Sequence, residues 1–490
     1  MQKISIDPIT RLEGHGKIDI FLDEEGNVAN AYLVIPELRG FEKFAEGRPV
    51  EELPDITPRI CGVCPEAHHM ASVKACDAVY HVEVPPAAKK LRELFYSAFY
   101  VADHMTHFYI LAGPDFVLGP DAPPAERNIL GLIHKVGLET GGRVIRARGM
   151  AMDIIGMLGG RKVHPLFGVP GGVGKAITEE ERAQIEAIAR EEVEFGLFSL
   201  QLFRQIVLDN SAYRDMILSD VFTLPTYYMG LVDEQNRVNF YDGMVRVVDP
   251  EGREFVKYAP HEYTQVIAEH VESWTYLKFP FLKKIGWKGL VTGKDSGIYQ
   301  ATPLSRLNAA DGMATPRAQE AYEEFYATLG GKPVHHTLAT HWARLIEMLY
   351  AAERLLELAT DPEITSPHVR NIPTATPDEG VGIVEAPRGT LTHHYITDER
   401  GLVVKCNLIV GTTNNYASIA MSVRQAAKGL IRKGQVITEG LLNRIEMAFR
   451  AYDPCFGCAT HALPGQMPLE VRIYDVEGRL KDILSRSLAS

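Results

Sequence analysis

The sequence predicts a mostly α-helical protein with peripheral β-structure, an α+β fold organised around a central bundle of long helices. Several long segments repeat apolar side chains with the 3.6-residue period of an α-helix. Shorter segments rich in β-forming residues, each divided by a turn, flank them. No internal repeat or low-complexity linker interrupts the 490 residues. We therefore expect one large domain rather than a string of small ones.

The helical pattern is found in residues 86–112, 178–208, 338–360 and 415–433, and in a shorter run that follows Thr438. In the first segment, Leu91, Leu94 and Ala98 fall on one helix face. Thr178 and Glu181 form the capping-box pattern that begins the second segment. These segments are expected to form the bundle.

Three hairpins are expected beside the bundle. Residues 17–22 and 28–35 form the first, with turn residues between them. Residues 243–258 turn at Asp-Pro-Glu-Gly (249–252), and residues 389–410 turn at 398–401. Both pairs of closely spaced cysteines described below are expected in loops beside the bundle.

The composition is that of a folded protein, with 46% hydrophobic and 23% charged residues. It excludes a disordered tail, a collagen-like fibre and a disulfide-dense secreted module. A net charge of −12 disfavours nucleic acid as the main partner, because phosphate binding needs clustered basic residues. No apolar run has the ~18 residues of a membrane span, and the first residues lack a secretory signal. We expect a cytoplasmic protein, or one carried elsewhere by a partner that has the signal.

The six cysteines carry most of the functional information. Cys61 and Cys64 form one C-x-x-C pair, and Cys455 and Cys458 form a second at the opposite end of the chain. Two such pairs suggest one four-thiolate metal site, either structural zinc or an iron–sulfur cluster. A thioredoxin-like dithiol is disfavoured, because no short βαβ unit surrounds either pair. Plain zinc is disfavoured too, since zinc modules usually keep their pairs within ~15–20 residues.

The residues around the pairs are more specific. The first pair lies in Arg-Ile-Cys-Gly-Val-Cys-Pro-Glu-Ala-His (59–68), and the second in Asp-Pro-Cys-Phe-Gly-Cys-Ala-Thr-His (453–461). With the ordered segments 7–15, 39–42, 103–109, 160–165, 170–172 and 385–389, they resemble the signature motifs of the nickel–iron hydrogenase large subunit. The resemblance extends from residue 7 to residue 461. It implies that subunit's fold, and it is strongest to the cytoplasmic, cofactor-linked, multi-subunit group.

The resemblance implies a set of metal ligands. In this family four thiolates bind nickel, and two of them also bridge to an iron that carries carbon monoxide and cyanide. By motif position, Cys61 and Cys455 are the terminal nickel ligands, and Cys64 and Cys458 are the bridges. The implied reaction is the reversible heterolytic cleavage of H2 into protons and electrons.

The resemblance also implies catalytic groups. Cys455 would accept the proton of H2, and Glu13 matches the carboxylate that relays it. Arg388 matches the arginine over the open metal position, with Asp103 and Asp453 as the acids that position its guanidinium.

Other residues are implied around the metals. Pro387 and Thr412 match cofactor-binding positions, and the Thr412 hydroxyl would bond a cyanide. His68 matches a donor to a bridging sulfur. Glu42, His461 and the Leu408 carbonyl match the ligands of a further Mg2+ or Fe2+ near the C-terminus. For the remaining histidines we expect satisfied core or supporting groups, namely His69, His104, His107, His393 and His394.

The cysteine count predicts a partner. Cys76 and Cys406 are expected to pack as small hydrophobic residues, and two thiols are too few for a usual iron–sulfur cluster. An iron–sulfur small subunit is therefore required to carry electrons. Further flavin or iron–sulfur subunits would lead to NAD(P), ferredoxin or a heterodisulfide reductase, while a protease and nickel-insertion proteins would mature the chain.

The last residues form a separate unit in this interpretation. Residues 1–461 are expected to be the catalytic domain, and 462–490 an extension removed after His461 once nickel is bound. The alternative for the extension is an ordinary terminal hairpin, residues 469–480, that stays attached. For the whole chain, the rival interpretations are a non-catalytic subunit resembling the quinone-site subunit of respiratory complex I, which lacks the nickel cysteines, and a zinc-stapled structural protein.

Overall fold

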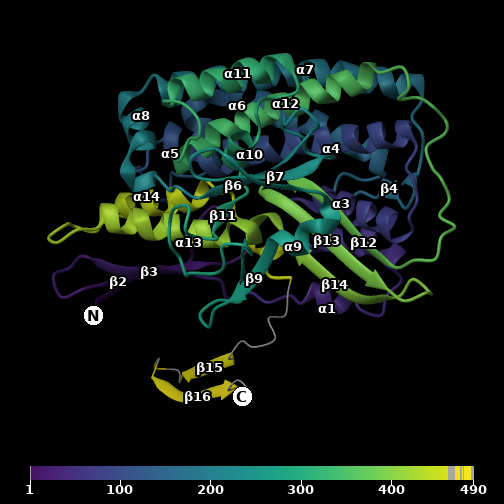
Figure 1. Ribbon diagram of the computed structural model, residues 1–490. Coiled ribbons are helices and arrows are strands. Elements are labelled where there is room, and N and C mark those ends of the chain that lie inside the picture. The colour runs from purple at the N-terminus through teal and green to yellow at the C-terminus, as the bar shows by residue number, and fades with distance from the viewer. Residues whose placement is uncertain (1, 462–468, 475–476, 478, 487–490) are drawn as a thin grey trace.

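The computed structural model describes residues 2–461, 469–474, 477 and 479–486. Its largest feature is a bundle of long helices, which occupies the upper half of Figure 1. The bundle consists of α4 (Pro86–Thr106), α6 (Ile129–Gly159), α7 (Glu179–Phe203), α11 (Pro316–Thr328) and α12 (Thr340–Thr360). Small sheets lie below it and at its side. The fold is therefore mostly α with peripheral β, as the sequence predicts.

The predicted helices are present with small differences at their ends. Residues 86–112 form α4 followed by a π-helical turn, and residues 178–208 form α7 followed by another. The capping box is formed: the Thr178 hydroxyl accepts from the Glu181 amide at 3.1 Å, and the Glu181 carboxylate accepts from the Thr178 amide at 3.0 Å. Helix α13 (Gly411–Leu430) begins before the predicted residue 415, because its polar first turn hides the apolar period. Helix α14 (Glu439–Arg450) follows Thr438, as predicted.

All three predicted hairpins are antiparallel strand pairs. They are β2 (Lys17–Leu22) with β3 (Val28–Val34), β7 (Met244–Val248) with β8 (Glu254–Tyr258), and β13 (Gly389–Thr397) with β14 (Val403–Ile409). Each belongs to a larger sheet, in the orders β1-β2-β3, β11-β6-β7-β8 and β12-β13-β14. The added strands are β1 (Gln2–Ile6), β6 (Tyr227–Val232), β11 (Tyr299–Gln300) and β12 (Glu379–Ala386).

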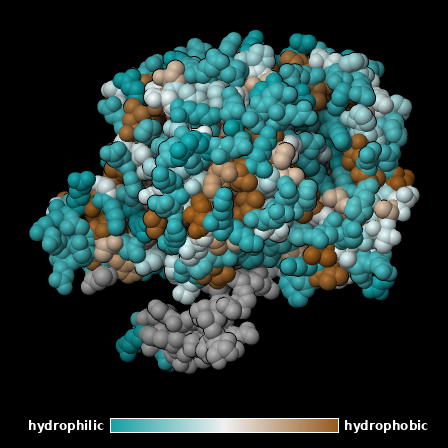
Figure 2. All heavy atoms as spheres, in the orientation of Figure 1, coloured by the Kyte–Doolittle hydropathy of each residue, from teal (hydrophilic) through white to brown (hydrophobic). Residues whose placement is uncertain are grey.

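Shorter elements complete the body. They are helices α1 (Phe41–Ala45), α2 (Leu53–Ile56), α3 (Pro65–Val79), α5 (Gly113–Val117), α8 (Ser211–Leu218), α9 (Tyr263–Val266), α10 (Pro303–Ala309) and α15 (Phe456–Ala459), and strands β4 (Gly168–Val169), β5 (Gly172–Val173), β9 (Ile267–Val271) and β10 (Lys278–Leu282). The face in Figure 2 is mostly hydrophilic, with scattered apolar side chains. Within the described residues, no helix combines the length and apolar character needed to cross a bilayer.

The two ends of the body are held together. Phe456 donates its amide to the Glu13 carbonyl at 3.0 Å, and Arg39 donates its amide to the Thr460 carbonyl at 2.8 Å. The sheet β1-β2-β3 shares an apolar core with α13 and α14, to which Ile20 and Tyr416 contribute. These contacts bring residues near Cys455 beside the N-terminal segment.

The last described strands, β15 (Leu469–Tyr474) and β16 (Leu480–Arg486), form a hairpin that stands clear of the body in Figure 1. This hairpin is longer than the predicted 469–480. The proposed cleavage point adjoins residue 462, which lies outside the described residues.

Helix α3 packs directly on strand β12, because glycines in the strand leave room for its backbone. A Cβ atom on Gly382 would lie 2.1 Å from the Ala71 carbonyl oxygen and 2.4 Å from the Ala75 nitrogen. Real Cβ atoms do not approach a backbone so closely. The position of α3, which follows Cys64 directly, therefore depends on Gly382.

We expect Gly382→Ala to force α3 away from the sheet and destabilise the protein by about 1–3 kcal/mol or more, since overpacking is costly. Thermal unfolding measures the effect. Gly142→Ala is the control, because an added Cβ there meets nothing within 4 Å. This exposed helical change should be neutral or stabilising by up to about 1 kcal/mol. Equal midpoints for Gly382→Ala and wild type would contradict the dependence of α3 on this glycine.

Candidate metal centre

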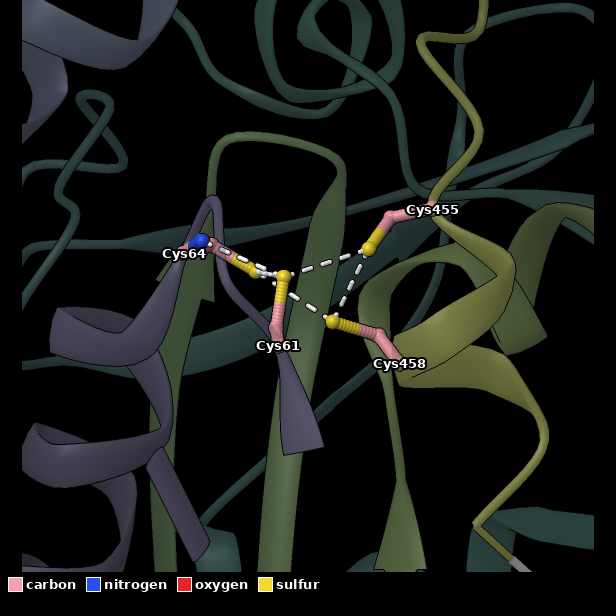
Figure 3. A group of neighbouring side chains, drawn as sticks. All are labelled: Cys61, Cys64, Cys455 and Cys458. Atoms are coloured by element: carbon pink, nitrogen blue, oxygen red, sulfur yellow. Dashed lines mark hydrogen bonds between the residues drawn. The ribbon is translucent and has the colours of Figure 1, made fainter. Parts of the chain in front are cut away.

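The four paired cysteines meet at one buried point. The Sγ–Sγ distances are 3.2 Å for Cys61–Cys64, 3.1 Å for Cys455–Cys458, and 3.3 Å for both Cys61–Cys455 and Cys64–Cys458. Figure 3 shows the sulfurs of the two pairs pointing toward one another from the N-terminal and C-terminal segments. The geometry therefore agrees with the prediction of one site built from both ends of the chain.

Short local structures aim the sulfurs. Cys64 is the residue before α3, and both Val63 and Cys64 direct their amides at the Cys61 sulfur, each at 3.2 Å. Cys455 precedes α15, and Cys458 lies within that single helical turn rather than in a loop. Arg39 joins the two segments by donating to the carbonyls of Ile60 and Gly457.

Burial controls the charge of these thiols. Burial and the neighbouring sulfurs raise the pKa of Cys455 and Cys458 well above the usual value. Burial also opposes ionisation of Cys61, but hydrogen bonds from the other sulfurs and the charge of Arg388 lower its pKa. Because burial opposes the ionisation of all four thiols, binding a metal must displace protons from them.

The donor set fits a thiophilic metal. All four sulfurs lie within 4.8 Å of one another, a span that one ion can bridge with metal–sulfur bonds of about 2.3 Å. Soft thiolates prefer zinc, nickel or the iron of iron–sulfur clusters to magnesium or calcium. Among the described residues, this is the one cluster of three or more His, Cys, Asp or Glu side chains with such spacing.

Glu13 lies against the cluster. Its Oε2 accepts from the Cys455 thiol at 2.9 Å and from the Gly457 amide at 2.8 Å. A side chain on Gly457 would collide with Glu13, since its Cβ would lie 2.5 Å from Oε1. Burial, followed by the negative charge of Cys61, raises the pKa of Glu13.

Arg388 is held between two acids. One terminal nitrogen of its guanidinium is 3.0 Å from Asp103 Oδ2, and the other is 2.9 Å from Asp453 Oδ2. All three side chains are buried. Burial would lower the pKa of Arg388, but the two acids more than offset it, so the guanidinium is charged. Asp453 has the uncommon φ of 53°, a left-handed conformation in the residue next to Pro454.

Thr412 and His68 contact the cysteine segments, and Pro387 adjoins Arg388. The Thr412 hydroxyl oxygen accepts from the Cys455 amide at 3.0 Å. The Pro387 carbonyl accepts from Arg306, which lies on the far side of the turn. His68 Nε2 is 3.4 Å from the Cys458 sulfur. Burial lowers the pKa of His68 to about 4, so this ring is neutral.

Glu42, Leu408 and His461 form a second group. His461 Nε2 lies 2.5 Å from the Leu408 carbonyl and 3.5 Å from Glu42 Oε1, while its Nδ1 lies 2.7 Å from the Cys458 carbonyl. Glu42 also accepts from the Leu408 amide at 2.8 Å. Both ring nitrogens therefore face carbonyl oxygens. Two donors are then needed, so the ring is protonated twice unless a cation takes the place of one proton.

Several residues beside these groups were not predicted from the sequence. Lys278 Nζ lies 3.7 Å from Glu42 Oε2 and 3.4 Å from Glu269 Oε2, and Glu269 Oε1 is buried without a hydrogen-bond partner. Arg306 and Glu347 form a buried ion pair behind Arg388. No local pattern marks these residues, because each is defined by contacts with distant parts of the chain.

The two remaining cysteines are buried as expected, but the histidines are not all satisfied, since His104 and His107 each have a buried Nδ1 without a hydrogen-bond partner. Cys76 and Cys406 are buried, and Cys76 donates to the Val50 carbonyl at 3.3 Å. His393 Nε2 lies 3.1 Å from His68 Nδ1, and its own Nδ1 lies 2.6 Å from the Tyr395 hydroxyl. The other histidines make supporting contacts: His69 with Pro54, His104 with Glu347, His107 with Arg450, and His394 with Tyr263.

Comparison with known proteins identifies the family. The nickel-dependent hydrogenase family matches residues 39–126 and 229–461, and a HoxL-like family matches residues 3–38. An iron–sulfur subunit of the F420-non-reducing hydrogenase of Archaeoglobus profundus is 50% identical, covering 98% of this chain and 99% of its own. The beta subunit of the NAD-reducing hydrogenase HoxS of Cupriavidus necator is 40% identical, covering 99% and 100%.

A solved structure agrees in fold and sequence. The crystal structure of an NAD+-reducing [NiFe]-hydrogenase in the H2-reduced state superposes with a TM-score of 0.88 and 38% identity, covering 94% of this chain and 100% of that one. These relatives and the clustered cysteines disfavour both the complex I-like scaffold and the zinc-stapled protein. The chain belongs to the nickel-dependent hydrogenase family, and it is a catalytic subunit of the nickel–iron type.

Proposed function

We propose that Cys61, Cys64, Cys455 and Cys458 hold a nickel–iron centre whose iron carries carbon monoxide and cyanide, and that H2 is cleaved reversibly there. The observation that carries this is the convergence of four buried sulfurs with one carboxyl and one guanidinium. When bound, the metal pair would polarise H2 and take up its electrons in a site that excludes water. By motif position Cys61 and Cys455 would be the terminal nickel ligands, and Cys64 and Cys458 would be shared with the iron.

Glu13 is the proton relay in this proposal. Its carboxylate is in direct contact with the Cys455 sulfur, so a proton accepted at Sγ needs to move only 2.9 Å between heavy atoms. Burial raises the pKa of this carboxyl, which favours its holding a proton that arrives from the sulfur. Glu13 is also partly exposed, which places it between the buried sulfur and solvent.

Arg388 supplies a fixed positive charge beside the thiolates. Asp103 and Asp453 hold both ends of its guanidinium, so it cannot turn away when charge develops at the metals. The Thr412 hydroxyl accepts from the Cys455 amide, which leaves its own proton to bond an anionic cyanide. Pro387 would border the same ligand. His68 would support the bridging sulfur of Cys458.

We also propose a second cation, Mg2+ or Fe2+, bound by Glu42, His461 and the Leu408 carbonyl. A neutral imidazole has only one N–H, so a cation bound at His461 Nε2 would remove the need for a second proton on the ring. Magnesium favours carboxylate and carbonyl oxygens, whereas the imidazole fits iron better. Lys278 lies beside Glu42, so such an ion would share the Glu42 carboxylate with the positive charge of Lys278.

Electrons must leave through a partner. Only Cys76 and Cys406 remain after the four ligands are assigned, too few for a usual iron–sulfur cluster, so an iron–sulfur small subunit is required. Gly62 and Val63, between the first two ligands, are exposed, so the shortest way out passes there. The relatives are named as hydrogenase subunits, and this chain would likewise belong to a larger assembly, cytoplasmic in this proposal, in which flavin or iron–sulfur subunits reduce NAD(P), ferredoxin or a heterodisulfide reductase.

Residues 462–490 would be removed on maturation, leaving the catalytic domain 1–461. Two observations support this division. The hairpin β15–β16 stands clear of the body, and the solved relative matches 94% of this chain with its entire length, whereas the Archaeoglobus profundus sequence matches 98%. The 461 residues of the proposed domain are about 94% of the 490. Nickel-insertion proteins and a protease would carry out this step.

Metal analysis and infrared spectroscopy test the centre. The complex matured under anaerobic conditions should contain nickel and iron and show carbon monoxide and cyanide bands, together with H2-dependent reduction of a dye. Magnesium or extra iron should accompany them. Stoichiometric zinc without such bands would defeat the proposal.

The proton relay is tested by Glu13→Gln. The amide keeps the size of the carboxyl but cannot carry the proton, so H2 turnover should fall by roughly 100-fold or more while nickel content stays constant. Exchange of H2 with D2O should fall equally. Glu37→Gln is the control, because Glu37 follows β3 and pairs with His15, close to Glu13 in the chain, without a contact to the sulfurs. Normal turnover in Glu13→Gln would exclude Glu13 from the proton path.

Intact mass spectrometry tests the maturation step. The active complex should contain a chain that ends at His461, and protein made without nickel should keep residue 490. An active chain of full length would show that the extension stays attached.

A further inference from the structure

Arg306, in the short helix α10, is fully buried and uses every donor of its guanidinium. Its Nε and Nη2 donate to the two oxygens of Glu347 at 2.6 and 2.7 Å. Nη1 donates to Glu385 Oε2 at 3.1 Å and to the Ala386 carbonyl at 3.0 Å, and Nη2 also donates to the Pro387 carbonyl at 3.0 Å. A guanidinium has five N–H groups, and all five are used.

One half of these contacts fixes the turn that carries Arg388. Arg306 binds the Ala386 and Pro387 carbonyls, which directly precede Arg388. The Glu385 carboxylate is anchored further by the Leu231 amide at 2.7 Å and the Thr390 hydroxyl at 2.9 Å. The turn between β12 and β13 is thus held by Arg306, Leu231 and Thr390 as well as by its own strand pairing.

The remaining hydrogen bonds of Arg306, those to Glu347, connect it to Arg388 by a second route. Glu347 Oε2 lies 2.9 Å from His104 Nε2. His104 follows Asp103 in α4, and Asp103 is the acid that holds one end of the Arg388 guanidinium at 3.0 Å. Hydrogen bonds and two chain connections, His104 to Asp103 and Pro387 to Arg388, therefore link Arg306, Glu347, His104, Asp103 and Arg388 in a ring.

We propose that Arg306 is a positioning residue for the hydrogenase reaction: it fixes both the backbone of Arg388 and the acid that orients the Arg388 guanidinium. The proposal rests on the role given to Arg388 above. Arg306 itself touches neither the thiolates nor the reacting atoms. Its fork is required because it binds two carboxylates and two carbonyls at once, whereas a lysine has one nitrogen and three donors.

The structural alternative is that Arg306 only stabilises the fold by neutralising Glu347 and Glu385. Both acids are fully buried, so removing the positive charge would leave them unpaired. Arg306→Lys keeps the charge and removes the fork, which separates the two roles. A purely structural role would lower the thermal midpoint and leave the metal site of the folded protein unchanged.

Arg92→Lys is the matched control. Arg92 is also buried and multiply bonded, to Asp77 and to the carbonyls of Val169 and Gly172, but none of these partners belongs to the Arg388 turn. The two variants should lose comparable stability. Only Arg306→Lys should change the reaction.

The experiment compares the nickel-loaded complexes of wild type, Arg306→Lys and Arg92→Lys. We expect Arg306→Lys to keep its nickel, to show shifted carbon monoxide and cyanide bands, and to lose roughly 10- to 100-fold in kcat with little change in KM for H2. Arg92→Lys should keep the wild-type bands and kcat. Unchanged bands and kcat in Arg306→Lys, or equal changes in Arg92→Lys, would overturn the proposal.

If Arg306→Lys does not assemble, Glu347→Gln weakens the same ring without altering Arg306, and the same shifts are expected. Failure of both variants to assemble, with normal assembly of Arg92→Lys, would assign the cluster to folding alone and overturn the positioning role. A wild-type complex without infrared bands or H2 turnover would instead refute the proposed function, and the positioning role would fall with it.

Discussion

The convergence of four sulfurs from opposite ends of the chain is the constraint on which the rest of the structure depends. Thiolates repel one another, and burial raises the pKa of most of these thiols, so the empty cluster resists ionisation. Only a multivalent cation and a permanent positive charge can balance four buried thiolates. Arg388 supplies the permanent positive charge, and the metals of the proposed centre would supply the multivalent cation.

Charge alternates outward from the sulfurs. Arg388 lies next to the thiolates and pairs with Asp103 and Asp453. Arg306, which binds the turn before Arg388, pairs with Glu347 and Glu385. Glu347 and Glu385 differ in their electrostatics. Burial raises the pKa of Glu385 to about 7, whereas the paired oxygens of Glu347 on Arg306 overcome burial and lower its pKa. A buried polar network of this kind is stable only when nearly every member is satisfied.

Local patterns predicted the fold in outline. The apolar period of α4 and α7, the Thr178 capping box and three hairpins were all readable, because these signals lie within a few residues. Helix α3 and the start of α13 were not predicted, since their sequences are polar or small where they pack against the metal loops and the sheet. Motif resemblance predicted the positions of the cysteines, Glu13 and Arg388. It could not reveal Arg306 or Lys278, whose importance arises from partners far away in the sequence.

The pairing of Glu13 with Cys455 has a consequence for biosynthesis. Cys61 and Cys64 come from the N-terminal part of the body, whereas Cys455 and Cys458 come from its C-terminal part, where Phe456 also binds the Glu13 carbonyl. A growing chain therefore carries Cys61 and Cys64 through most of its synthesis before Cys455 and Cys458 are added. Closing so long a loop is entropically costly and depends on the completed helical body. The four-sulfur site can therefore form only after Cys458 has been made, and in the proposed maturation the extension 462–490 is removed after the metals are bound.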